Sequence, residues 1–172
     1  MKVFLHNTSV FEVKAEAIVL PVDLSAKSMG GSIVRQFQKI IGETEWLDLE
    51  FQIEFPYPNG MMQVANMISN HLPFKEAVFL GSLTHSPEHN PAAIMRSAFD
   101  EVCEWVGRMT VQGLATPLLV GGRRLNSVLA LQTMLSVADR YQKGELHIAI
   151  PDRKLYQMAL AHVPSFPDET VS

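Results

Sequence analysis

Two nearly continuous apolar runs, at residues 17–22 and 114–120, constrain the fold of this chain more than any other feature of its sequence. Such runs are typical of central strands that are buried on both faces of a sheet. Each run is followed by a short loop that contains glycines and then by a helical pattern, which begins near Ser32 in the first case and near Ser127 in the second. Strands that alternate with helices predict an α/β fold of three layers, α/β/α, with a mixed, largely parallel central sheet.

Shorter patterns predict the other elements of this fold. We expect further strands at residues 3–5, 49–55, 61–67, 77–80 and 146–150, and helices at residues 33–41, 91–109, 127–141 and 153–162. The strand at 49–55 rests on the alternation of apolar with polar residues. Ser32, Asn90 and Asp152 are the predicted N-caps of three helices, and Gly42 is predicted to end the first of them.

The size and charge of the chain limit the number of domains and the kinds of partner. The 172 residues, of which 47% are hydrophobic and 19% charged, suit one domain at residues 1–163, followed by a C-terminal tail at 164–172. The net charge of −4 does not favour duplex nucleic acid as a partner. Because we find no apolar run of about 20 residues and no signal peptide, we expect a cytoplasmic protein without a membrane partner.

The two loops that contain glycines form the candidate binding site. In largely parallel sheets, ligands bind beyond the carboxyl ends of central strands, so the loops meet if the two apolar strands are parallel neighbours. The backbone N–H groups of Gly30, Gly31 and Ser32 would face an anion at the start of a helix, where the helix dipole favours negative charge. Arg123 or Arg124 would add a bidentate pair of hydrogen bonds to a phosphate. The alternatives are an ordinary turn for the glycines and a solvated pair for the arginines.

Other reactive side chains give weaker signals. Cys103 lies beside the apolar stripe of the helix at 91–109, which indicates a core residue rather than a nucleophile. His85 and His89 are separated by Pro87, which does not suit a metal-binding face of a helix. We find no phosphate-binding or dinucleotide-binding glycine motif, no zinc-protease motif and no nucleophile elbow, and therefore expect neither a cofactor nor a metal.

The order of these motifs resembles that of the macro domains, a family that binds ADP-ribose. Residues 20–23 stand where the family has an asparagine-containing loop, and residues 30–33 stand where it has a glycine-rich run and the start of a helix. Residues 117–122 correspond to its second binding loop, which has a proline, two apolar residues and two glycines. The resemblance extends from Lys2 to about Ala161, and it implies the three-layer fold and a small-molecule ligand.

Several positions depart from the pattern of the family. Asn7 stands where the family has an acidic residue that accepts a hydrogen bond from the adenine amino group. Leu20 and Asp23 stand where it has asparagines, which contact the distal ribose and, in its hydrolases, position the attacking water. Arg123 and Arg124 stand where it has an aromatic residue. The ligand-binding residues implied by the loops and by the resemblance are Asn7, Asp23, Gly30, Gly31, Ser32, Ile33, Val120, Gly121, Gly122, Arg123 and Arg124.

Three functions stay open at this point. The first is binding of a nucleotide or an ADP-ribose-related molecule at an altered site, without strong catalysis. The second is a divergent ADP-ribosyl hydrolase in which Asp23, a weak catalytic candidate, orients the water. The third is a protein-interaction module without a ligand, in which Leu20, Val120 and Leu125 fill the former cleft. A protein partner or a homo-oligomer is an additional expectation, and an open crevice between residues 23–32 and 120–126 would favour ligand binding.

Overall fold

A computed structural model gives the structure of this chain, and it describes residues 1–22, 31–54, 62–68, 72–81, 90–109, 112–120 and 125–163. The strands are β1 (Lys2–His6), β2 (Ala17–Val22), β3 (Met62–Asn66), β4 (Glu76–Gly81), β5 (Gly113–Pro117) and β6 (Glu145–Ala149). The helices are α1 (Ser32–Ile41), α2 (Glu43–Phe51), α3 (Pro91–Arg108), α4 (Ser127–Ala138) and α5 (Arg153–His162), with a short 3-10 helix η1 (Val10–Glu12). No helix in these ranges is long and apolar enough to cross a membrane.

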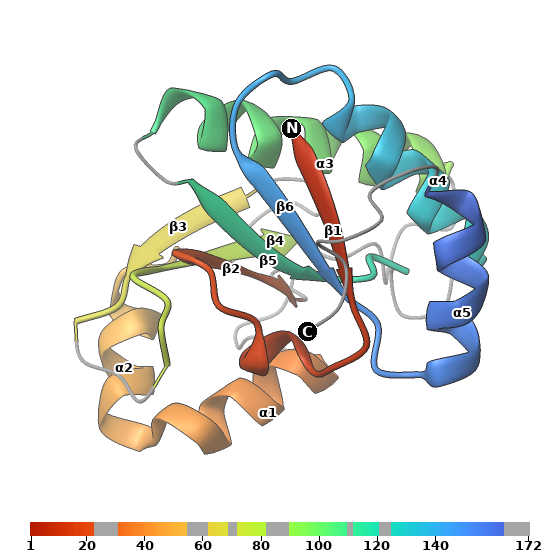
Figure 1. Cartoon of the computed structure of the whole chain (residues 1–172). Helices are drawn as coiled ribbons and strands as arrows, with labels where there is room; N and C mark the ends of the chain where they lie inside the picture. Colours follow the sequence, from red (N-terminus) through yellow and green to blue (C-terminus); the bar gives the residue numbers. More distant parts are fainter. Residues whose placement is uncertain are drawn as a thin grey trace.

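The strands form one sheet in the order β1-β6-β5-β2-β4-β3 (Figure 1). All neighbours pair in parallel except β3, which runs antiparallel to β4. The two apolar runs of the sequence, β2 and β5, are parallel neighbours, with Ala17 opposite Leu114 and Ile18 opposite Ala115. The loops that follow them therefore leave the sheet at the same edge, as the candidate site requires.

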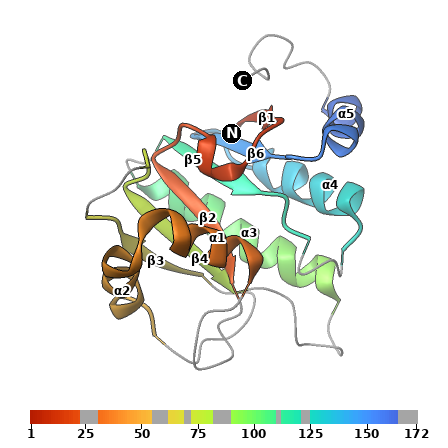
Figure 2. The same ribbon diagram turned by 90° about the horizontal axis from the view of Figure 1, so that it is seen from below.

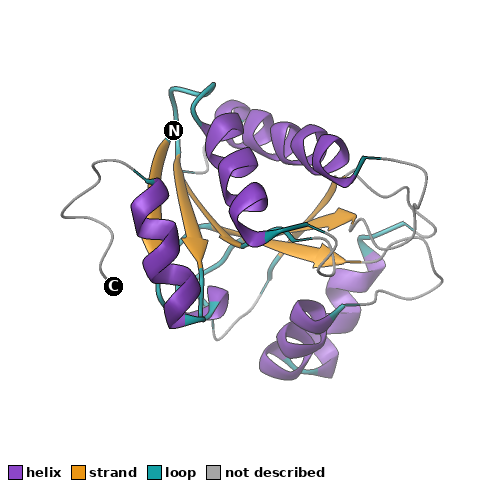
Figure 3. Cartoon of the chain, turned by 90° about the vertical axis from the view of Figure 1, so that its right-hand side faces the viewer, coloured by secondary structure: helices purple, strands orange, loops and turns teal. Residues whose placement is uncertain are grey.

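Helices cover both faces of the sheet (Figure 3). One apolar core joins the sheet to α3, α4 and α5, and a second core joins it to η1, α1 and α2. Figures 1 and 2 show α1 and α2 together on one side of the sheet. Alternate residues of β2 divide between the two cores, since Ala17 and Val19 pack in the first and Ile18 and Leu20 in the second. This confirms the predicted three-layer fold with a largely parallel central sheet.

Several local predictions are confirmed. The Asn90 side chain accepts a hydrogen bond from the Ala92 N–H at 3.0 Å and caps α3, and Asp152 accepts one from the Leu155 N–H at 2.8 Å and caps α5. Gly42 ends α1 at a φ of 87°, a conformation that favours glycine. Cys103 is fully buried, and burial raises the pKa of its thiol to about 12, so it is a core residue.

The strand predicted at residues 49–55 is wrong, because residues 43–51 form α2. Trp46, Leu49 and Ile53 are buried at helical spacing, whereas Phe51 of the apparent alternation is 91% exposed. The Trp46 ring packs edge-to-face with the Phe79 ring of β4, at a centroid distance of 6.2 Å, and so fixes α2 to the sheet. The apolar residues that alternate along the sequence suggested a strand. The buried positions are instead three and four residues apart, which is the spacing of one face of a helix.

The side chain of Gln52, just after α2, closes part of the outer edge of β3. Its Nε2 donates to the Asn66 carbonyl at 3.0 Å, and its Oε1 accepts from the Asn66 N–H at 2.8 Å. These two bonds replace those that a neighbouring strand would make, and they occupy backbone groups that otherwise invite pairing with another chain.

Replacing Gln52 with alanine is expected to lower the free energy of unfolding by about 1 kcal/mol, because its exposed hydrogen bonds to Asn66 and a weaker one to the Asp48 carbonyl are lost. Hydrogen exchange should become faster at the Asn66 amide, while the amides of β2 keep their rates. Gln157→Ala is the matched control, since Gln157 is an exposed glutamine of α5. Unchanged exchange at Asn66 in the Gln52 variant would show that the bonds to Gln52 do not protect this edge.

Candidate functional site

A cleft of ≈ 430 Å³ lies beyond the carboxyl ends of β5 and β6. It is lined by Ser9, Val10, Ile33, Gln36, Pro117, Leu118, Ala149, Ile150, Pro151, Asp152 and Leu155. We call it the carboxyl-edge cleft. Its residues come from four segments, namely the turn after β1, the first turns of α1, the end of β5, and the connection from β6 into α5. Its volume lies in the range of about 300–1,000 Å³ that is usual for small-molecule sites.

The walls of the carboxyl-edge cleft are mainly apolar, and two of its three polar side chains are already engaged. The Ser9 hydroxyl accepts from the Phe11 N–H at 3.4 Å, and the Asp152 carboxylate caps α5. The third, Gln36, is exposed on α1. Apolar walls with a few polar groups suit a planar, mostly apolar group with polar edges, such as a nucleobase.

Asn7 fixes one border of the cleft. Its Nδ2 donates to the carbonyl of Ile150 at 3.0 Å and to the carbonyl of Pro151 at 3.1 Å, which ties the end of β1 to the connection that lines the cleft. Both amide protons are used in this way, and the side chain is exposed. The two carbonyls fix the orientation of the amide group, because only its nitrogen can donate to them. The amide oxygen of Asn7 therefore points away from these carbonyls and is available as an acceptor.

The start of α1 brings three of the predicted residues together. Gly31 is the N-cap, with a φ of 127°, and no side chain caps the helix. A Cβ at Gly31 would lie 3.2 Å from the Pro21 carbonyl oxygen, so both the conformation and the space favour glycine here. The prediction that Ser32 is the N-cap is wrong, because Ser32 is the first helical residue. Ile33 follows it and lines the cleft.

The second predicted loop is described only at its two ends. The Val120 carbonyl accepts from the Leu125 N–H at 3.0 Å, which brings the ends of the loop together. Gly121, Gly122, Arg123 and Arg124 lie outside the described residues. The same holds for Asp23 and Gly30 of the first loop, so the roles of these six residues stay predictions.

The three residues proposed to fill the former cleft do not gather in one place. Leu20 is fully buried in the core beside α1, whereas Leu125 is buried in the core on the opposite face of the sheet, with Val120 packed against that core. They therefore do not form a single apolar plug. Most of the crevice predicted between residues 23–32 and 120–126 lies outside the described residues.

Sequence reasoning missed the part of the site that belongs to α5. Ile150, Asp152 and Leu155 line the cleft, and they follow the apolar strand β6. The signal was present, because the chain passes from this strand through a capping Asp152 into a helix, as it passes from the two apolar runs into theirs. In a parallel sheet, a third junction of this kind lies at the same edge as the other two.

A pair of histidines, His6 buried and His147 partly buried, lies where β1 and β6 meet. The His6 Nε2 is 2.9 Å from the His147 Nδ1, and the His147 Nε2 is 3.3 Å from the Glu145 Oε2. If the His147 Nε2 carries the proton that faces the carboxylate, the His6 Nε2 is the donor to the His147 Nδ1. Burial and the neighbouring His147 lower the pKa of His6 to about 4, and burial also lowers the pKa of His147. Both rings are therefore neutral at neutral pH.

The comparisons with known proteins give a clear result for structures only. No family model and no curated protein matches the chain. The Oceanobacillus iheyensis macrodomain matches at a TM-score of 0.71 and 14% identity, over 92% of this chain and 90% of that one. The macrodomain of Mycobacterium tuberculosis DarG matches at a TM-score of 0.68 and 17% identity, over 87% of this chain and 98% of that one. The Trypanosoma brucei macrodomain matches at a TM-score of 0.74 and 12% identity, over 93% of this chain and 66% of that one.

Proposed function

We propose that this chain, which has the macrodomain fold, binds an adenine-containing ligand of the ADP-ribose class in the carboxyl-edge cleft. The fold predicted from the resemblance is confirmed by the solved structures, and identities of 12–17% show the fold alone. The observation that carries the proposal is the cleft itself, an apolar site bordered by Asn7 and by the uncapped start of α1.

The described residues suit the adenosine part of such a ligand. Ile33, Leu118 and Leu155 offer apolar surface for a planar base. The Asn7 amide oxygen then accepts a hydrogen bond from the adenine amino group, without the charge that an acidic residue would add. The bonds from Asn7 to two carbonyls support this role, because they hold the amide nitrogen away from the ligand.

The phosphates of the ligand belong at the start of α1 in this proposal. The helix dipole and the free N–H groups of a first turn without a side-chain cap favour an anion there. Arg123 and Arg124 stay predictions for the same task. One structure of the Oceanobacillus iheyensis macrodomain is described as a variant with ADPR, which supports a ligand of this class.

The burial of Leu20 supports binding without strong hydrolysis. Leu20 has no exposed surface and lies in the core beside α1, so its side chain does not orient a water molecule or contact a ribose. Asp23, on which the divergent hydrolase depends, lies outside the described residues. Binding is therefore the function that the described residues favour.

Titration calorimetry with ADP-ribose, AMP and NAD tests the proposal. Ile33→Glu is expected to weaken ADP-ribose binding at least about tenfold, because it places a carboxylate in an apolar site near the phosphates. Ile40→Glu is the matched control on the same helix, since Ile40 is 39% exposed and does not line the cleft. It should bind as the unmodified chain does.

A second titration tests the role of Asn7. The hypoxanthine analogue of ADP-ribose presents an oxygen in place of the adenine amino group, so it is expected to bind about fivefold more weakly. Flat calorimetric traces with all three adenine ligands would refute the proposed function. Equal binding of the two analogues would refute only the contact with Asn7.

A further inference from the structure

The negative charge of this chain is concentrated in one segment. Between Lys39 and Lys75 there is no lysine or arginine, whereas five of the 18 acidic residues lie there. They are Glu43, Glu45, Asp48, Glu50 and Glu54. The rest of the chain contains the other 13 acidic residues and all 14 lysines and arginines, so its net charge is close to zero. The net charge of −4 is thus a property of α2 and its surroundings.

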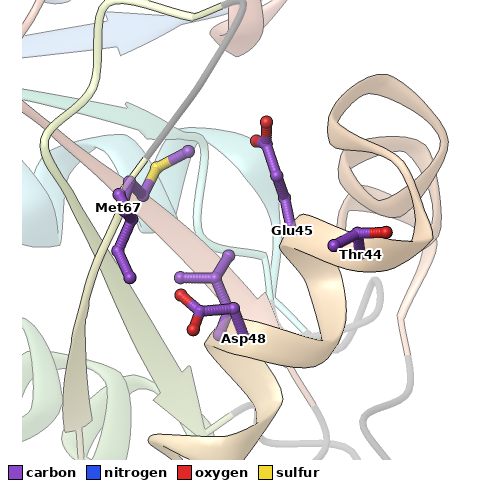
Figure 4. A pocket seen from close by; sticks show the side chains of 6 residues that line it. Thr44, Glu45, Asp48 and Met67 are labelled. Atoms are coloured by element: carbon purple, nitrogen blue, oxygen red, sulfur yellow. The ribbon is translucent and has the colours of Figure 1, made fainter.

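A second pocket lies within this acidic segment. It has a volume of ≈ 240 Å³ and is lined by Thr44, Glu45, Asp48, Leu49, Met67 and Ile68. We call it the α2 groove. Figure 4 shows Met67 facing α2 across the groove, with Glu45 and Asp48 on the helix side. The groove shares no lining residue with the carboxyl-edge cleft, so both sites are available at the same time.

Large apolar side chains are exposed on α2 and beside the α2 groove. Phe51 is 91% exposed, Ile68 is 78% exposed and Leu47 is 48% exposed. Leu47 and Phe51 are four residues apart on α2, so they share one face of the helix. Ile68 is itself part of the groove. Ile68 therefore adds exposed apolar surface to the α2 groove itself, where it suits contact with a partner.

We propose that the α2 groove docks a protein segment in which an apolar side chain is flanked by lysines or arginines. The pocket between Leu49, Met67 and Ile68 takes the apolar side chain. Asp48, which is exposed and forms no ion pair within the described part of the chain, lies at the rim and attracts the flanking cations. Charge complementarity of this kind guides association and selects the partner.

The same charges argue against other classes of occupant. Phosphate groups of nucleic acids and the anionic headgroups of membranes are disfavoured here, because the segment between Lys39 and Lys75 carries five carboxylates and no lysine or arginine. A purely apolar partner would leave Asp48 at the rim without a counter-charge. A basic and apolar protein segment satisfies both features of the groove.

Selection from a random display library of twelve-residue peptides, against the full chain, tests the proposal without prior choice of a sequence. The enriched peptides are expected to share an apolar residue with lysines or arginines on either side. Asp48→Lys should weaken the binding of an enriched peptide at least tenfold, and Ile68→Ser should weaken it about as much. Raising the salt concentration should also weaken binding, because exposed charges are screened.

Two matched variants separate the α2 groove from general effects of charge and surface. Glu104→Lys makes the same change of charge at an exposed residue of α3, and Met158→Ser removes an exposed apolar side chain from α5. Both should bind the peptide within twofold of the unmodified chain. Enrichment of no peptide, or of peptides without basic residues, would overturn the proposal, as would binding that survives both groove substitutions. Sedimentation that shows a second copy covering the groove would also overturn it.

Discussion

Leu20→Asn is expected to lower the free energy of unfolding by about 4 kcal/mol, although it restores the residue type that the resemblance to macro domains implies. Leu20 has no exposed surface, lies opposite Phe79 of β4, and packs in the core that β2 shares with α1. Replacing a buried leucine by a smaller side chain costs about 2–5 kcal/mol. A buried amide without a partner adds about 1–3 kcal/mol.

Denaturant unfolding monitored by tryptophan fluorescence measures this effect, because Trp46 packs in the same core. Leu20→Met is the control, since a swap of similar volume costs less than about 1.5 kcal/mol. If the asparagine variant loses less than about 1 kcal/mol, position 20 accommodates a polar group. The burial of Leu20 would then no longer argue against hydrolysis.

The stability of the domain is expected to fall by about 2–3 kcal/mol as the pH is lowered from 6.5 to 4, because of the His6–His147 pair. The folded state lowers the pKa of His6 from 6.5 to about 4, so in this range the unfolded chain binds more protons than the folded one. Stability then rises with pH through this window and is complete above the unfolded pKa. The lowered pKa of His147 acts in the same direction.

Urea unfolding at several pH values between 4 and 7 measures this dependence. His6→Leu should flatten the curve in that window, because the residue with the largest change in proton binding is removed. His162→Gln removes an exposed histidine of α5 and should leave the curve unchanged. A curve of equal slope in the His6 variant would assign the acid sensitivity to other groups.

Local patterns were sufficient to predict most of the fold. The buried runs of β2 and β5, and the capping residues Asn90 and Asp152, act over a few residues, so they can be read without knowledge of the tertiary structure. The segment around Phe51 could not be read in this way. Its apolar residues fit both a strand and a helix, and only the packing of Trp46 against Phe79 decides between them.

The candidate site was predicted less completely than the fold. Ile33 lines the carboxyl-edge cleft, and Asn7 and Gly31 lie beside it, while their roles in ligand binding stay predictions. Ile150 and Leu155, which line it, were not predicted, because they are brought to Ile33 by the order of strands in the sheet. The order of strands in the sheet cannot be predicted from a local sequence pattern.

The place of β1 in the sheet has a consequence for the synthesis of this protein. The neighbour of β1 in the described sheet is β6, and Lys2 lies opposite Glu145. A ribosome therefore releases the first strand long before the strand that it pairs with, and the nascent chain carries an apolar strand without a partner through most of translation. Completion of the sheet waits for residues 145–149, so a ribosome that stalls before this point leaves an aggregation-prone intermediate rather than a smaller folded domain.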